Sequence, residues 1–104
     1  MIQFIKNILG MGPSTDWQEL IGKGAQIVDV RTTSEYSSGH IRGSKNIPLQ
    51  SLPAKLSGLR KDKPVITCCA SGMRSASAKS ILISAGFQEV HNGGSWSSLQ
   101  NRIS

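Results

Sequence analysis

Two short apolar runs rich in β-branched residues constrain the fold of this chain more than any other feature. Ala25–Val30 and Val65–Cys68 each have the length and composition of a strand buried on both faces. Helical patterns lie between and after them, the strongest over Ser75–Ala85. Strands separated by helices pair in parallel through right-handed crossovers. We therefore expect a small three-layer α/β fold with a central, mainly parallel sheet and helices on both faces.

Several weaker elements complete this expected architecture. Asp16 and Glu19 have the spacing of a capping box and open a short helix, which Gly22 and Gly24 end. The other predicted elements are a helical turn over Ser34–Ser38, an extended piece over Asn46–Leu49, a helix over Pro53–Leu59 capped by Ser51, a strand over Glu89–Asn92, a tight turn at Gly93-Gly94 and a helix over Ser95–Ile103.

The chain has 104 residues, enough for one domain with a modest core. Residues 1–13 carry apolar side chains at a helical spacing interrupted by Lys6, and they end in a linker of Gly and Pro. We therefore divide the chain into an amphipathic arm and linker over 1–13 and one domain over 14–104. Neither the uninterrupted apolar core of a signal peptide nor a membrane span of about 20 apolar residues is expected.

The charge balance favours small anionic partners over nucleic acid. Twelve Lys and Arg against six Asp and Glu give a formal net charge of +6. The charges are scattered, and we interpret the one tight basic cluster, at 60–63, as a solvated turn. With one Tyr, two Phe and two Trp, the chain has no run of aromatic residues interleaved with basic ones that could stack bases.

The two cysteines, Cys68 and Cys69, are neighbours and cannot connect distant parts of the chain through a disulfide. A structural zinc site needs about four ligands, and His40 and His91 lack the spacing of a ligand pair, so we expect no metal. Reduced thiols are typical of the cytoplasm, which is the location that we expect, without stable membrane insertion.

The segment Val65–Ser75 runs from the second apolar strand through a loop of small residues into the strongest helix. Ligands of open α/β sheets lie beyond the carboxyl ends of the strands, so this loop is the candidate site. The N–H groups of a curled loop, the helix N-terminus and Arg74 would stabilise a thiolate and lower its pKa below the free value of about 8.5. Because side chains alternate along a strand, Cys68 should turn into the sheet packing and Cys69 should be the nucleophile.

Three ordered motifs resemble those of the rhodanese-like sulfurtransferases. Cys69–Ser75 matches the family's active-site signature of Cys, any residue, Ser, Gly, any residue, Arg and Ser. Ile27–Leu49 (IVDVRTTSEYSSGHIRGSKNIPL) matches a second signature, and Asn92–Trp96 fits a closing Gly-Gly and Trp turn. The resemblance covers about Asp16–Ile103 and implies the rhodanese-like fold.

The resemblance also implies a ping-pong sulfur transfer. The Cys69 thiolate would attack the outer sulfur of an anionic donor such as thiosulfate, and sulfite would leave. The persulfide on Cys69 would then pass its sulfur to cyanide or to another thiol, so the implied partners are a small sulfur anion or a protein persulfide donor and a thiol acceptor. The covalent persulfide takes the place of a cofactor. The sequence assigns no oligomeric state.

The resemblance implies roles for further residues. The loop N–H groups would cradle the persulfide, Arg74 would orient the donor, Asp29 and Arg31 would be scaffold residues beside the site, and His40 and Trp96 would belong to structural turns. The implied substrate-binding residues are Ala70, Ser71, Gly72, Met73, Arg74 and Ser75.

Two departures from the family pattern keep alternatives open. Counting from Cys69 gives the Cys-x4-Arg loop of sulfurtransferases, but counting from Cys68 gives Cys-x5-Arg, the spacing of related phosphatases and arsenate reductases. Ala70 stands where several relatives place Arg or Lys to attract thiosulfate, which argues against efficient use of thiosulfate and leaves a persulfide relay from a protein partner open. The alternatives are thus a phosphatase or arsenate reductase that uses Cys68, a non-catalytic binding module, and a redox role in which Cys68 resolves an oxidised Cys69.

Overall fold

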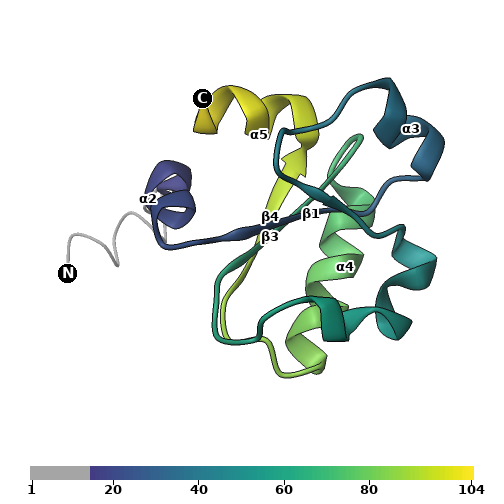
Figure 1. Cartoon of the computed structure of the whole chain (residues 1–104), viewed down its shortest axis with the longest axis vertical. Coiled ribbons are helices and arrows are strands. Elements are labelled where there is room, and N and C mark those ends of the chain that lie inside the picture. Colours follow the sequence, from purple (N-terminus) through teal and green to yellow (C-terminus); the bar gives the residue numbers. More distant parts are fainter. Residues whose placement is uncertain (1–14) are drawn as a thin grey trace, which may run out of the picture.

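The computed structural model describes residues 15–104, and the predicted arm over 1–13 lies outside the described residues. Helices and strands alternate along the chain (Figure 1). In chain order the elements are α2 (Trp17–Gly22), β1 (Gln26–Asp29), α3 (Thr33–Ser38), β2 (Lys45–Asn46), the 3-10 helices η1 (Leu49–Ala54) and η2 (Leu56–Gly58), β3 (Val65–Cys69), α4 (Met73–Ser84), β4 (Val90–Ser95) and α5 (Trp96–Ile103).

The four strands form one sheet in the order β2-β1-β3-β4, and every pair is parallel. Ile27 of β1 pairs with Ile66 of β3, which in turn pairs with His91 of β4. Because all strands run in one direction, their carboxyl ends lie at the same edge of the sheet. The loop between β3 and α4, which contains the predicted site, therefore lies at the edge where β1 and β4 also end.

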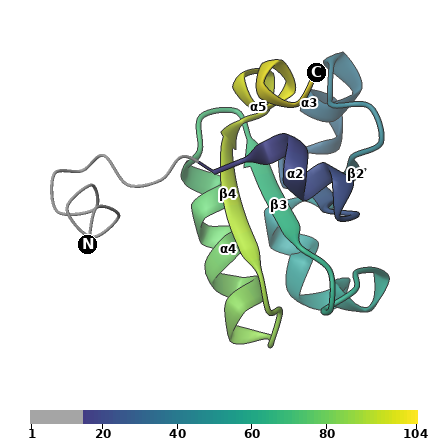
Figure 2. The same ribbon diagram turned by 90° about the vertical axis from the view of Figure 1, so that its left-hand side faces the viewer.

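Helices cover both faces of the sheet, so the predicted three-layer α/β fold is confirmed. Helix α4 and the 3-10 helices cover one face, and α2 and α5 cover the other (Figures 1 and 2). Neighbouring strand residues point to opposite faces: Val28 and Val65 are buried with α4, whereas Ile27 and Ile66 are buried with α5. Burial on both faces explains why these strands are apolar along their length.

Side-chain caps fix the start of three helices. Asp16 Oδ1 accepts a hydrogen bond from the Glu19 backbone N–H over 3.0 Å, as the sequence predicts. Helix α3 has a complete capping box, in which the Thr32 and Glu35 side chains each accept from the other residue's backbone N–H. The Ser95 hydroxyl caps α5.

The prediction of a helix over Pro53–Leu59 is wrong. The chain there forms two 3-10 helices, and the predicted cap Ser51 lies inside the first of them. Pro53 has no N–H to donate into an α-helical ladder, which favours these short turns. Helix α4 also begins at Met73, two residues before the predicted start.

The prediction of a tight turn at Gly93-Gly94 is also wrong, because both residues lie within β4. The β3–β4 register shifts between Thr67 and Cys69, so the strand bends without reversing. Gly94 has a φ of +77°, and a Cβ on Gly93 would lie 2.8 Å from a Leu99 methyl carbon. Gly93 and Gly94 therefore allow β4 to bulge and to pack closely under Leu99. None of the helices built from residues 15–104 has the length and apolar character needed to cross a membrane.

Candidate active site

The loop between β3 and α4 curls back over the end of its own strand. Gly72 has a φ of +108° and caps α4, a conformation that a side chain would resist. A Cβ on Gly72 would lie 3.5 Å from the Gly94 Cα, so the loop rests closely against β4. The backbone N–H groups of the loop consequently turn toward the end of β3, where Cys69 lies.

The Cys69 sulfur is fully buried and surrounded by hydrogen-bond donors. The Gly72 backbone N–H donates to it over 2.9 Å and the Ser75 backbone N–H over 3.4 Å, and the Ser75 hydroxyl oxygen lies at 3.4 Å. Burial alone would raise the pKa of this thiol. The hydrogen bonds from Ser75, Gly72 and Ser71 outweigh that effect and hold the pKa of Cys69 below its ordinary value.

Asn92 of β4 supports this donor set, a role at the site that the sequence did not predict. Its side-chain oxygen lies 2.6 Å from the Ser75 hydroxyl and accepts the Gly94 N–H over 2.9 Å, and its amide donates to the Gly72 carbonyl over 3.3 Å. Asn92 thus ties the loop and the start of α4 to β4. The sequence feature that indicates this role of Asn92 is its position at the sheet edge, just before two glycines.

Cys68 faces the other side of the sheet, as the strand alternation predicts. It is fully buried in the cluster that includes Ile66 of β3 and Leu99 of α5. Burial, with the nearby Asp29 carboxylate, raises the pKa of Cys68 to about 12. Cys68 is therefore a neutral thiol at ordinary pH. Its side chain packs on the face of the sheet opposite to the loop that encloses the Cys69 sulfur.

Arg74, the predicted donor-orienting residue, forms a bidentate ion pair with Glu35 of α3. The two Nη–Oε distances are 2.7 and 2.9 Å, and both side chains are partly exposed. The Arg74 guanidinium, together with the backbone N–H of Thr32, lowers the pKa of Glu35 to about 2. The sequence assigned Glu35 no role, although its spacing from Thr32 was the signal of a capping box.

Asp29 and Arg31 form a buried ion pair beneath the site. The Arg31 guanidinium donates to the Asp29 carboxylate over 2.7–3.0 Å and to the Gly39 carbonyl over 2.7 Å. It also lies over the Trp96 ring, 4.8 Å from the ring centroid. Arg31 therefore joins the end of β1 to α3 and α5. His40 stacks on Tyr36 with a centroid separation of 3.7 Å, on the exposed side of α3.

The rim of the loop is exposed at Ala70, Ser71 and Met73, and the Met73 side chain is 80% exposed. Beside this rim, a hollow of about 130 Å³ is lined by Arg74 and by residues of the segments that follow β1 and β2, the start of η1 included; Cys69 does not line it. The remaining lining residues are Val30, Thr32, Pro48, Leu49 and Gln50.

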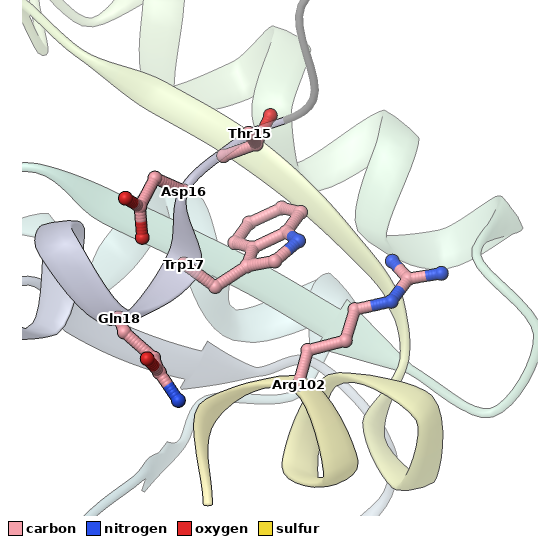
Figure 3. Close-up of a pocket in the computed structure, with 5 residues that line it drawn as sticks. All are labelled: Thr15, Asp16, Trp17, Gln18 and Arg102. Carbon is pink, nitrogen blue, oxygen red and sulfur yellow. The ribbon is translucent and has the colours of Figure 1, made fainter.

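A larger surface hollow lies away from the loop, between the start of α2 and the end of α5. Its volume is about 850 Å³, and the half-buried Trp17 and the Arg102 guanidinium face it (Figure 3). None of the predicted site residues lines it. Within residues 15–104, no group of three or more His, Cys, Asp or Glu side chains is placed to hold a metal ion.

Comparisons with known proteins agree with this architecture. The family model described as "Rhodanese-like domain" matches residues 14–101. The chain is 41% identical over 68 residues to the uncharacterized protein YqhL of Bacillus subtilis, covering 65% of this chain and 54% of that protein. It is 39% identical over 69 residues to the thiosulfate sulfurtransferase GlpE of Stutzerimonas stutzeri, covering 66% of this chain and 63% of that protein. The matches thus span just over half to under two thirds of these two relatives.

A structural comparison finds the same fold. The structure of a rhodanese with anions from E. coli superimposes with a TM-score of 0.68 at 30% sequence identity, covering 71% of this chain and 89% of that one. The fold of this chain is thus similar to that of a solved rhodanese structure.

Proposed function

Because this chain belongs to the rhodanese-like domain family, we propose that it is a sulfurtransferase that carries sulfane sulfur as a persulfide on Cys69. One observation carries the proposal: the Cys69 sulfur accepts hydrogen bonds from the Gly72 and Ser75 backbone N–H groups, which lower its pKa. A thiolate is the nucleophilic form of cysteine. The donor class is a small sulfur anion or a protein-borne persulfide, and the acceptor is a thiol or cyanide.

The first half-reaction breaks one sulfur–sulfur bond and forms another. The Cys69 thiolate attacks the outer sulfur of thiosulfate, the bond to the inner sulfur breaks, and that inner sulfur leaves with its electron pair as sulfite. In the second half-reaction an acceptor thiolate attacks the outer sulfur of the Cys69 persulfide and regenerates the Cys69 thiolate. Charge and atoms balance in both steps, because each replaces one sulfur anion by another.

The loop supports the persulfide as well as the thiolate. The N–H groups that stabilise the Cys69 thiolate also stabilise a persulfide, whose negative charge lies one atom further out. The N-terminus of the 12-residue helix α4 adds the favourable effect of its dipole. The Cys69 sulfur is buried, so the donor has to approach over the exposed rim at Ala70, Ser71 and Met73.

The observations favour Cys69 over the Cys68 alternative. A phosphatase or arsenate reductase that used Cys68 would need a thiolate enclosed by the loop, but Cys68 packs against the opposite layer and its pKa is about 12. A non-catalytic binding module would have no need for the donors gathered around the Cys69 sulfur.

Steady-state kinetics with thiosulfate and cyanide test the proposal. We expect initial-rate lines that stay parallel as the second substrate is varied, as in a ping-pong mechanism. Cys69→Ser should abolish turnover, and the matched control Cys68→Ala should retain it. Turnover that survives Cys69→Ser would contradict the proposal. Hydrolysis of an aryl phosphate that is lost in Cys68→Ala but kept in Cys69→Ser would establish the Cys68 alternative instead.

A further inference from the structure

The positive charge of the active-site loop is neutralised by a residue outside it. Arg74 is the one Lys or Arg in the loop 70–75, and both of its terminal nitrogens donate to Glu35. Glu35 is itself held in place, because its Oε1 accepts from the backbone N–H and the hydroxyl of Thr32 over 3.0 and 3.1 Å. The ion pair therefore joins a loop residue to a carboxylate that α3 has already oriented.

The other charges near the site also cancel. Asp29 and Arg31 form a buried pair beneath the loop, so each offsets the other. The charged groups that act on Arg74 are Glu35, Cys69 and Asp29, with Glu35 the strongest. The two ion pairs, Glu35 with Arg74 and Asp29 with Arg31, together carry no net formal charge. When Cys69 ionises, the site acquires a net charge of −1.

This charge balance disfavours a doubly charged donor. Thiosulfate carries two negative charges and, within residues 15–104, meets a thiolate near which Arg74 and Arg31 are each paired with a carboxylate, so its approach is opposed by like-charge repulsion. An alkyl persulfide carries at most one charge on its sulfurs. The hollow beside Arg74 is lined by Val30, Pro48 and Leu49 and suits an uncharged carrier group.

We propose that Glu35 is a specificity-determining residue that, by pairing with Arg74, selects persulfides carried on thiols over free sulfur dianions. The inference rests on the proposed sulfurtransferase function and names its preferred donor class. Glu35 contacts Arg74 and not the reacting sulfur, so it acts through the charge of its partner.

The substitution Glu35→Gln tests this selectivity. Glutamine preserves the capping box, so α3 should still form, while Arg74 gains an uncompensated positive charge. We expect KM for thiosulfate to fall on the order of tenfold, because one unit of repulsion toward a dianion is removed. KM for cysteine persulfide, whose amino and carboxyl groups cancel and whose sulfurs carry at most one negative charge, should fall by no more than about threefold.

A matched control changes the net charge by the same amount elsewhere. Asp62 pairs with Arg60 over 2.7 Å in an exposed turn before the amino end of β3, at the opposite edge of the sheet. Asp62→Asn should leave KM for both donors unchanged. If it lowered KM for thiosulfate as much as Glu35→Gln does, the effect would come from overall charge and the inference would be overturned.

Two further variants separate charge selection from simple positioning of Arg74. Arg74→Gln should raise KM for thiosulfate, and the double variant with Glu35→Gln should return it close to the wild-type value. If Glu35 only positions Arg74, Glu35→Gln should raise KM for thiosulfate, and the double variant should behave like Arg74→Gln.

Detection of the Cys69 persulfide, after incubation of the wild-type protein with each sulfur donor, distinguishes the two proposals. A wild-type chain that forms no Cys69 persulfide with either donor would overturn the proposed function and this inference with it. A normal Cys69 persulfide, with KM for thiosulfate unchanged in Glu35→Gln, would overturn the inference alone.

Discussion

Cys68 and Cys69 are consecutive residues whose sulfurs lie in opposite layers of the protein. The Cys69 sulfur is 2.9 Å from the Gly72 backbone nitrogen on the α4 side, whereas Cys68 is buried with Leu99 on the α5 side. Hydrogen bonding lowers the pKa of Cys69, and burial raises that of Cys68 to about 12. The alternation of a strand thus separates two identical side chains into a candidate nucleophile and a core residue.

Alkylation should distinguish the two thiols. We expect iodoacetamide at neutral pH to modify Cys69 in the native protein and to leave Cys68 unmodified, because only the former has a stabilised thiolate. Peptide mass spectrometry locates the adduct, and the same reaction in denaturant, where both thiols should react, is the control. Equal labelling of both cysteines in the native state would show that the loop does not activate Cys69.

Removal of the Ser75 hydroxyl should raise the pKa of Cys69. Ser75→Ala removes the hydroxyl whose oxygen lies 3.4 Å from the Cys69 sulfur and which helps to lower the pKa of that thiol, and a hydrogen bond to a charged group contributes about 1.5–3 kcal/mol. The midpoint of thiolate formation, followed by ultraviolet absorbance, should move upward by about one to two pH units. Ser80→Ala, on the exposed side of α4, is the matched control. An unchanged midpoint in Ser75→Ala would refute this role.

The ion pair between Glu35 and Arg74 should make stability dependent on pH in acid. The pKa of Glu35 is lowered from an ordinary 4.5 to about 2, so its contribution to folding is complete above pH 4.5 and is lost as pH falls through about 2. Urea unfolding between pH 2 and pH 6 should show a flatter pH dependence in Glu35→Gln than in the wild type. Parallel profiles for the two proteins would contradict the lowered pKa.

A methyl group at Gly93 should destabilise the fold. A Cβ there would lie 2.8 Å from Leu99 Cδ2, 2.9 Å from Ile66 Cγ2 and 2.9 Å from the Thr67 carbonyl oxygen. Overpacking of this kind costs about 1–3 kcal/mol, which chemical denaturation of Gly93→Ala can measure. At Gly22, in α2, an added Cβ meets nothing within 4 Å, so Gly22→Ala should be neutral or stabilising. Gly93→Ala with wild-type stability would contradict the packing described for β4.

The sequence predicted those parts of the fold that depend on local pattern. The apolar runs of β1 and β3 and the small-residue helix α4 carry their own signals, and alternation placed Cys68 in the core. The glycines at 93 and 94 were misassigned because the local sequence allows both a turn and a strand. Contacts with Ile66 of β3 and Leu99 of α5, which form only in the folded chain, decide between them.

The candidate site, too, could be predicted only where its residues are close together in the sequence. The loop from Cys69 to Ser75 is contiguous and could be recognised in the sequence. Glu35 lies 39 residues from Arg74, and Asn92 lies 17 residues from Ser75, so only the folded sheet brings these pairs together. The segment 49–58 was misassigned in part as one helix, because its local sequence does not distinguish two short 3-10 turns around Pro53 from an α-helix.

Mass spectrometry of the protein after incubation with a sulfur donor is the most direct test of whether Cys69 carries the transferred sulfur. We expect the mass of one added sulfur atom on Cys69, which a thiol reductant removes and which Cys68→Ala retains. Absence of the adduct in the wild type, or an adduct that persists in Cys69→Ser, would contradict this expectation.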